Sequence, residues 1–346
     1  MDRIRRNLPQ FVVGAFLVLM VVLTVLATDI PVAGLLGDSL VRLFMNGVLV
    51  LSLVPMLRAG AGINYGLPVG IMAGLLAMCI AVSADLPPAA GFAVALVLSV
   101  LIGMAFGYGY ARILHRTRGQ EEITGLFFGF AAVFIMCFFW AVAPFKHPQM
   151  VWPIGGEGLR PSIGLEAHFG QVLNDFASFS VAGVEVPTGG LLFFALLCLI
   201  VALFCRTRAG WAMTTVGENE DFASLSGIRV ERFRTAAVIM STVLAAIGIC
   251  VYAQSYNFLQ LYDAPLMMAF PAASAILLGG STGRNASVLF VIVGTLLFQT
   301  LYVFSGPLAN ELLVPEMTEI TRVIITSGII LYALLFQGRR GHATEA

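Results

Sequence analysis

Long apolar runs alternate with short polar segments along the 346 residues of this chain. An α-helix needs about 20 apolar residues to cross the hydrocarbon core of a bilayer. Ten runs approach this length, at residues 9–28, 39–57, 66–83, 88–112, 121–143, 189–205, 233–256, 264–280, 286–304 and 319–337. The pattern predicts an all-α, polytopic membrane protein of about ten transmembrane helices, with residues 1–346 forming a single transmembrane domain.

Composition supports the membrane assignment and excludes several classes of protein. Hydrophobic residues make up 59% of the chain and charged residues only 11%, whereas soluble domains average about 45–50% and 25%. The chain has no basic block, so we expect it to bind membrane lipid and no nucleic acid. None of the five cysteines forms a Cys-x-x-Cys pair, and the sequence therefore predicts no metal site.

The distribution of basic residues predicts the orientation. With a cytoplasmic N-terminus, all but four of the 19 Lys and Arg residues lie in inner loops. The four on the outer side are Arg42, Lys146, Arg160 and Arg322. Because basic residues concentrate in cytoplasmic loops, both termini are predicted to be cytoplasmic.

Two connections are unusually long. Residues 144–188 form an outer, periplasmic loop, far longer than the usual connection of about 4–6 residues, which favours a lid or docking surface over a plain connector. Residues 206–232 form a cytoplasmic loop in which a short helix is predicted from about Asn219 to Gly227. This helix places Phe222 and Leu225 on one face and suits docking of a cytosolic partner. The alternative, a helix lying on lipid, usually requires a basic polar face.

The predicted spans are almost free of ionisable groups. Glu121, Glu122 and Asp263 lie at span ends, where charges are tolerated. The four histidines (His115, His147, His168 and His342) lie in loops or the tail. The sequence therefore argues against a proton-coupled pump and against an intramembrane enzyme.

Glycine and proline interrupt two spans. Residues 58–70 hold four glycines and Pro68, and residues 263–280 hold Pro265 and Pro271. If spans 2–5 and 7–10 are inverted repeats, the interruptions correspond, as they do at transporter substrate sites; ordinary kinked packing helices are the alternative. The nearby polar and aromatic candidates for a substrate pathway are Asn46, Asn64, Tyr65, Thr124, Phe127, Phe128, Gln254, Phe270 and Ser274. Without a buried charge among them, the pathway suits a neutral polar solute with an apolar face.

The cytoplasmic loop also carries a family resemblance. The matching residues are Arg206, Thr207, Gly210, Ala212, Val216, Gly217, Asn219, Ala223, Gly227 and Ile228. Together with Ala275–Gly280 and Gly294–Leu296, this pattern resembles the permease subunits of bacterial ABC importers of the ribose, simple-sugar and nucleoside branch. The sequence departs from the pattern at Ser224. Residues Ala61–Gly66 also lack the aspartate and serine of ribose-type permeases, which leaves sugar and nucleoside both open.

The resemblance implies a permease of the bacterial inner membrane that works by alternating access. Its implied partners are cytosolic ATP-binding subunits, a periplasmic solute-binding protein and a second permease subunit, as a homo- or heterodimer. The chain lacks a Walker phosphate-binding loop, so it is expected to use no cofactor and not to be an enzyme. The residues expected to couple to the ATPase are Gly217, Glu218, Asn219, Asp221, Ala223 and Gly227. The rival interpretation is a stand-alone secondary transporter or channel.

Overall fold

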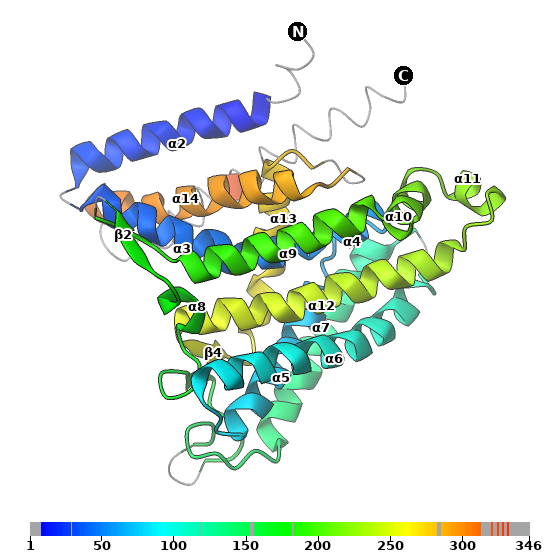
Figure 1. Ribbon diagram of the computed structural model, residues 1–346, viewed down its shortest axis with the longest axis horizontal. Helices are drawn as coiled ribbons and strands as arrows, with labels where there is room; N and C mark the ends of the chain where they lie inside the picture. Colours follow the sequence, from blue (N-terminus) through cyan, green and yellow to red (C-terminus); the bar gives the residue numbers. More distant parts are fainter. Residues whose placement is uncertain are drawn as a thin grey trace.

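The chain folds into a bundle of α-helices, most of which run close to a common direction, while α7 and α13 cross it (Figure 1). The computed structural model describes residues 8–28, 30–117, 119–152, 156–181, 183–281 and 285–312, together with positions 320, 324, 327, 328 and 331. The helices are α2 (Leu8–Ala27), α3 (Val32–Leu51), α4 (Leu53–Arg58), α5 (Leu67–Ser83), α6 (Pro88–Leu114), α7 (Glu121–Val142), α8 (Val172–Asp175), α9 (Thr188–Arg206), α10 (Arg208–Glu218), α11 (Glu220–Leu225), α12 (Val230–Tyr256), the 3₁₀ turn η1 (Ala264–Met267), α13 (Ala269–Leu278) and α14 (Val288–Leu312).

The helices agree with the apolar runs of the sequence. Among the described residues, six helical segments are long and apolar enough to cross a membrane, and three shorter apolar helices cover Phe11–Ala27, Leu67–Ser83 and Ala264–Leu278. A helical, multi-pass architecture is thereby confirmed. The last predicted span, 319–337, lies almost wholly outside the described residues, so the count of ten and the inverted repeat stay predictions.

Helix α12 lies at the centre of the bundle and packs against α3, α5 and α6. Small residues allow these backbones to approach closely, as is usual between helices in membranes. A Cβ atom added at Gly70 of α5 would lie 2.6 Å from the Cβ of Ala245, and one added at Gly107 of α6 would lie 3.0 Å from the Cα of Ile239. Close backbone packing therefore holds this part of the bundle together.

Helices α13 and α14 meet through a pair of glycines. A Cβ atom added at Gly294 would overlap the carbonyl oxygen of Ala275 and lie 2.8 Å from the amide nitrogen of Gly279. A Cβ atom at Gly279 would overlap the carbonyl oxygen of Phe290. Only glycine fits at either position.

The 144–188 connection is folded and not a bare linker. It contains β1 (Ser162–Gly164), helix α8, β2 (Phe179–Val181) and β3 (Val184–Val186). Strand β1 pairs antiparallel with β4 (Phe258–Gln260), and β2 pairs with β3. Four strands of three residues each thus qualify the all-α prediction. The β1–β4 pair buries Ile163 and Leu259, and buried backbone groups need hydrogen-bond partners.

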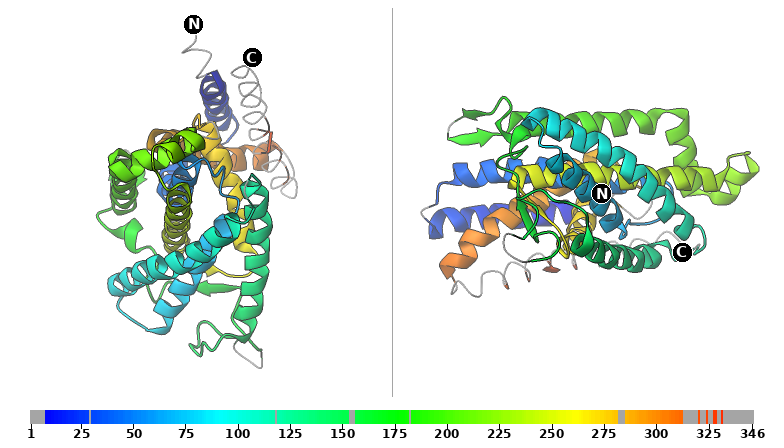
Figure 2. Two further views of the ribbon diagram at one scale, coloured as in Figure 1. Left: turned by 90° about the vertical axis from the view of Figure 1, so that its right-hand side faces the viewer. Right: turned by 90° about the horizontal axis from the view of Figure 1, so that it is seen from below.

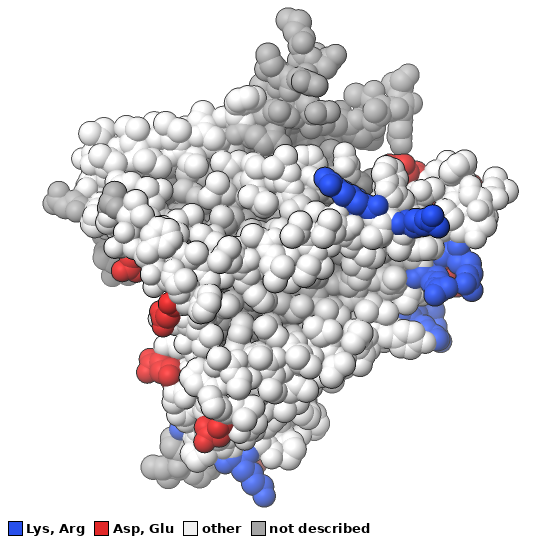
Figure 3. All heavy atoms as spheres, viewed as in Figure 1, with Lys and Arg blue, Asp and Glu red and all other residues white. Residues whose placement is uncertain are grey.

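The two ends of the bundle differ in charge. Most of the Lys and Arg visible in Figure 3 gather at the end that carries α10 and α11, while most of the Asp and Glu gather at the opposite end. Figure 2 (right) shows the β2–β3 hairpin and α11 at opposite ends of the molecule. The strands and the short α10–α11 helices therefore mark two chemically distinct ends.

Candidate functional site

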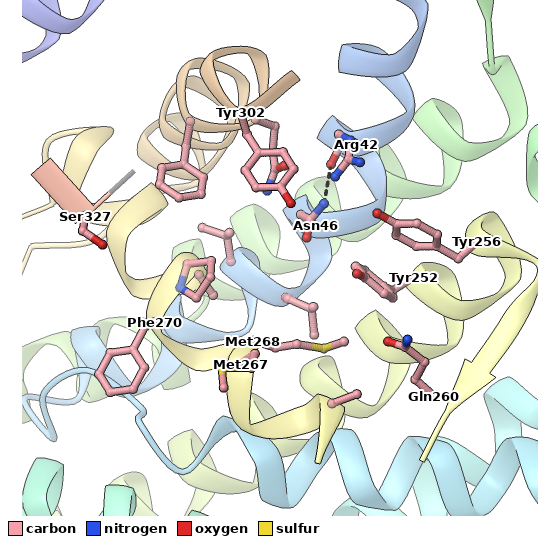
Figure 4. A pocket seen from close by; sticks show the side chains of 17 residues that line it. Arg42, Asn46, Tyr252, Tyr256, Gln260, Met267, Met268, Phe270, Tyr302 and Ser327 are labelled. Carbon is pink, nitrogen blue, oxygen red and sulfur yellow. Dashed lines mark hydrogen bonds between the residues drawn. The ribbon is translucent and has the colours of Figure 1, made fainter. Parts of the chain in front are cut away.

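A cavity of about 530 Å³ lies between α3, α12, the η1–α13 segment and α14 (Figure 4). This volume is within the range of about 300–1,000 Å³ that small-molecule sites occupy. Its polar and aromatic lining is Arg42, Asn46, Tyr252, Tyr256, Gln260, Phe270, Phe298, Gln299, Tyr302 and Ser327. Aliphatic and methionine side chains complete the wall, so the cavity combines flat apolar surfaces with a few hydrogen-bonding groups.

The lining includes one charged side chain among the described residues, that of Arg42. Its guanidinium carbon lies 4.9 Å from the ring centroid of Tyr302 and 5.9 Å from that of Tyr256, both within cation–π range. Among the described residues, no carboxylate forms a salt bridge with Arg42. This cavity therefore differs from the predicted pathway, which held no buried charge. The sequence signal was present, because Arg42 falls inside the apolar run 39–57, but it was assigned to the outer loop.

Four of the predicted pathway residues lie in or next to this cavity. Asn46 and Phe270 line it directly. The ring of Tyr65 lies 5.5 Å from that of Phe270, and the hydroxyl of Ser274 donates to the carbonyl of Phe270 at 2.7 Å. The two interrupted segments of the sequence thus meet here, because Tyr65 precedes α5 and Phe270 begins α13.

Two further candidates belong to a separate buried network. The Asn64 amide donates to the Ser241 hydroxyl at 2.8 Å, and its carbonyl oxygen accepts from the Tyr110 hydroxyl at 3.1 Å. The ring of Phe128 stacks on Tyr110 with centroids 5.4 Å apart. Asn64 therefore joins the irregular segment before α5 to α6 and α12, away from the lining of the cavity.

Replacing Asn64 with leucine is expected to lower the free energy of unfolding by about 2–4 kcal/mol, because the buried hydroxyls of Ser241 and Tyr110 lose their partner. Thermal unfolding of the purified protein in detergent would measure the loss. Adding Tyr110→Phe and Ser241→Ala to the variant should restore part of it. An unchanged unfolding temperature in Asn64→Leu would contradict the assignment.

The remaining three pathway candidates lie elsewhere. Phe127 is 66% exposed on the outside of α7, and Thr124 lies in the first turn of the same helix. Gln254 is buried, and its side chain accepts from the Leu173 backbone N–H at 3.1 Å and donates to Asn174 at 3.1 Å. Gln254 therefore links α12 to α8 by hydrogen bonds. None of the three residues lines the cavity.

The predicted cytoplasmic helix is present as α11, in a shorter form. The side chain of Asn219 caps it by accepting from the Phe222 N–H at 2.9 Å. At the other end the N–H of Ile228 donates to the carbonyl of Ala223 at 2.9 Å, with Gly227 at φ +77°, which is a Schellman ending. Asp221 lies in the first turn of α11, as expected.

Gly217 and Glu218, both expected to couple to the ATPase, lie at the end of the preceding helix, α10. Helix α10 was not predicted from the sequence, because the Thr207 side chain caps it directly after α9. The Thr207 hydroxyl accepts from the Gly210 N–H at 3.2 Å.

Gly217 touches the interruption between α4 and α5. A Cβ atom at Gly217 would overlap the carbonyl oxygen of Arg58 and lie 2.8 Å from the amide nitrogen of Gly60. The reverse is also true, since a Cβ atom at Gly60 would lie 2.8 Å from the Cα of Gly217. The end of α10 therefore packs directly against the backbone of residues 58–60.

A second route connects α11 to the same interruption through charged groups. Arg234 of α12 lies 3.0 Å from a carboxylate oxygen of Glu220 in α11 and 3.8 Å from one of Glu121 in α7. The next residue, Glu122, accepts a hydrogen bond from the Ile63 N–H at 2.8 Å. These contacts join α11, α12, α7 and the 59–66 segment. Glu121 thus pairs with Arg234, and Glu122 binds the backbone of the 59–66 segment.

At the opposite end, three residues form a cluster of possible metal ligands, and the expectation of no metal site stays a prediction. Ligand atoms of Asp85, His147 and His168 all lie within 4.8 Å of one another, and His168 Nδ1 lies 3.6 Å from Asp85. Burial and the neighbouring His147 lower the pKa of His168, with Asp85 opposing the shift. Neither cysteine spacing nor the positions of the histidines along the chain indicated this cluster, because its members are far apart in the sequence.

Comparison with known proteins places these features in a family. The family model described as "Branched-chain amino acid transport system / permease component" matches residues 35–336. The nucleoside ABC transporter permease NupB of Lactococcus lactis is 24% identical over 243 residues, covering 68% of this chain and 62% of NupB. NupC of the same organism is 28% identical over 143 residues, covering 38% of this chain and 44% of NupC.

The other matches are of the same kind. The autoinducer 2 import system permease LsrD of Photorhabdus luminescens is 27% identical over 146 residues, covering 41% of this chain and 43% of LsrD. The matches thus span less than two thirds of each of these relatives. A solved inward-facing ABC transporter of metal-chelate type aligns over 93% of this chain and 98% of its own, with 12% identity and a TM-score of 0.46.

Proposed function

The chain belongs to the family of permease components of branched-chain amino acid transport systems, and from this membership we propose that it is the membrane-spanning subunit of an ATP-driven importer of nucleosides. The observation that carries the proposal is the family match over residues 35–336, which includes α10, α11 and the glycine contact at Gly217. As a permease component, the chain transports and is not an enzyme by itself.

Nucleoside is favoured over sugar by two observations. The relatives NupB and NupC are nucleoside permeases by name, and the segment Ala61–Gly66 lacks the polar pair of ribose-type permeases. The aromatic walls of the cavity also suit a flat base.

The end with α10 and α11 is proposed as the docking site for the ATP-binding subunit, which would hold the ATP. Phe222 is 59% exposed and Leu225 is 89% exposed there, although both are apolar. A surface hollow of about 620 Å³ adjoins them, lined by Glu220, Asp221 and the 227–232 segment. Exposed apolar side chains next to a hollow are typical of a protein-binding surface.

The charge distribution supports placing this end in the cytoplasm. Both chain termini would then be cytoplasmic in a bacterial inner membrane. The β-strands and the 144–188 connection would face the periplasm, where a solute-binding protein docks. A second permease subunit, identical or related, would complete the pathway.

In the proposed mechanism, closure of the ATP-binding subunits moves α11. Arg234 passes this displacement to α7, and the Gly217–Gly60 contact passes it to the segment between α4 and α5. That segment adjoins the cavity through Tyr65, so its movement would open the cavity to alternate sides of the membrane.

Reconstitution tests the proposal. The permease is combined in liposomes with its ATP-binding subunit and solute-binding protein, and uptake of labelled inosine is measured. We expect uptake only with ATP and both partners. Uptake by the permease alone, without ATP, would instead identify a stand-alone transporter. ATP-dependent uptake of ribose but not of nucleosides would show that the substrate is a sugar.

Replacing Arg234 with glutamine is expected to reduce inosine uptake per ATP hydrolysed by about 10-fold, because Glu220 and Glu121 lose their shared charged partner. Glu220→Gln should give a similar loss, and the double variant should be no worse than either single one. Arg112→Gln is the matched control, since Arg112 is exposed on α6 and contacts Tyr108 of the same helix. Additive losses in the double variant would contradict a connection through this ion pair.

A further inference from the structure

Arg42 lies in an environment where a free positive charge is costly. It is ten residues into α3, about 15 Å along the helix from Val32, inside a segment apolar enough to span a membrane. Ionisable residues in such segments usually mark a substrate or ion pathway. Arg42 also lines the cavity, so the charge and the space for a ligand coincide.

The surroundings of Arg42 leave its hydrogen-bond donors available. Tyr302 and Tyr256 contact the guanidinium group through their rings, and Figure 4 shows both tyrosines beside it. The faces of the two tyrosine rings stabilise the positive charge, but they accept no hydrogen bond from the five N–H donors that lie in the guanidinium plane. In the part of the chain that the structure describes, no carboxylate pairs with these donors. A ligand in the cavity can therefore receive them.

The neighbouring Asn46 offers the cavity a hydrogen-bond acceptor, whereas Arg42 offers donors. Its amide group donates to the carbonyl oxygen of Arg42 at 3.1 Å, and this bond orients the side chain (Figure 4). The oxygen of the Asn46 side chain then remains as an acceptor. Arg42 and Asn46 lie one helical turn apart, so the cavity wall offers a donor pair next to an acceptor.

A guanidinium group binds two adjacent acceptors with two parallel hydrogen bonds. The 6-oxopurine ring presents such a pair, O6 and N7, and arginine recognises guanine through these atoms. Adenine places an amino donor beside N7 and would set donor against donor. Resting on the proposed function, we propose that Arg42 selects the imported solute by binding two adjacent acceptors, and that this solute is a 6-oxopurine nucleoside such as inosine or guanosine.

Competition against inosine uptake by the reconstituted transporter tests this selection. For the unaltered protein we expect unlabelled inosine and guanosine to compete at least about 10-fold better than adenosine. Arg42→Gln should bring the two classes within about 2-fold of each other, while Arg42→Lys should fall between, because lysine keeps the charge and loses the paired donors. Arg112→Gln is the matched control, since Arg112 also contacts a tyrosine ring, Tyr108, but does not line the cavity.

Several results would overturn the inference. Equal competition by adenosine and inosine in the unaltered protein would do so, as would a preference that survives in Arg42→Gln. Benzoate could compete as strongly as inosine does, while the other nucleosides do not compete. The acceptor pair would then be a carboxylate, and the purine assignment would be wrong. Absence of any ATP-dependent nucleoside uptake contradicts the proposed function instead. If Arg42→Gln does not assemble, the inference is decided by the ratio of inosine to adenosine competition in the unaltered protein and in Arg42→Lys.

Discussion

Replacing Gly217 with alanine is expected to lower ATP-driven uptake by about 10-fold or more while leaving ATP hydrolysis by the assembled transporter in place. The added methyl group would overlap the carbonyl oxygen of Arg58. Its other neighbours, at Ala59 and Gly60, are also backbone atoms, which cannot turn aside as a side chain can. The end of α10 must then move away from the 58–60 segment, and the displacement of α11 no longer reaches it.

Uptake and ATP hydrolysis measured on the same liposomes would show the separation of the two activities. Gly109→Ala in α6 is the control, because nothing lies within 4 Å of a Cβ atom at that position. Normal uptake by Gly217→Ala would show that this contact does not transmit the movement. Parallel loss of uptake and hydrolysis would indicate failed assembly with the ATP-binding subunit, which also contradicts a role limited to transmission.

The second large effect is expected at Gly294. Alanine there should destabilise the protein by about 3 kcal/mol or more, because its methyl group would overlap the Ala275 carbonyl oxygen and force α14 away from α13. The loss would appear as a lower unfolding temperature in detergent and reduced yield from membranes.

Gly14→Ala in α2 provides the comparison, since a Cβ atom there has nothing within 4 Å. This variant should be neutral or slightly more stable, because alanine is a better helix former than glycine. If Gly294→Ala and Gly14→Ala unfold at the same temperature, the two helices are not held at the distance described.

The sequence predicted the helices well because the apolar runs of a membrane protein are long and sharply bounded. Helix α7, for example, covers Glu121–Val142, against a predicted run of 121–143. The cap at Asn219 and the ending at Gly227 were also predicted, since both depend on residues only a few positions apart.

The candidate site was predicted only in part, because hydropathy shows that a segment is a helix but not which faces of different helices meet. Asn46 and Phe270 were identified from residue type and proved to share a cavity. Arg42 was assigned to the outer loop because its tyrosine partners lie more than 200 residues away in the chain. Gln254 was grouped with the pathway for its polarity, although its partners in α8 could be known only from the fold.

The contact between Gly60 and Gly217 has a consequence for building hybrid permeases. Because no side chain separates the two backbones, no substitution at a neighbouring position can make room for a larger residue at either one. A cytoplasmic segment transplanted from another permease would therefore function here only if it brings a glycine to position 217. Compatibility between donor and recipient can thus be judged from these two positions before overall sequence similarity is considered.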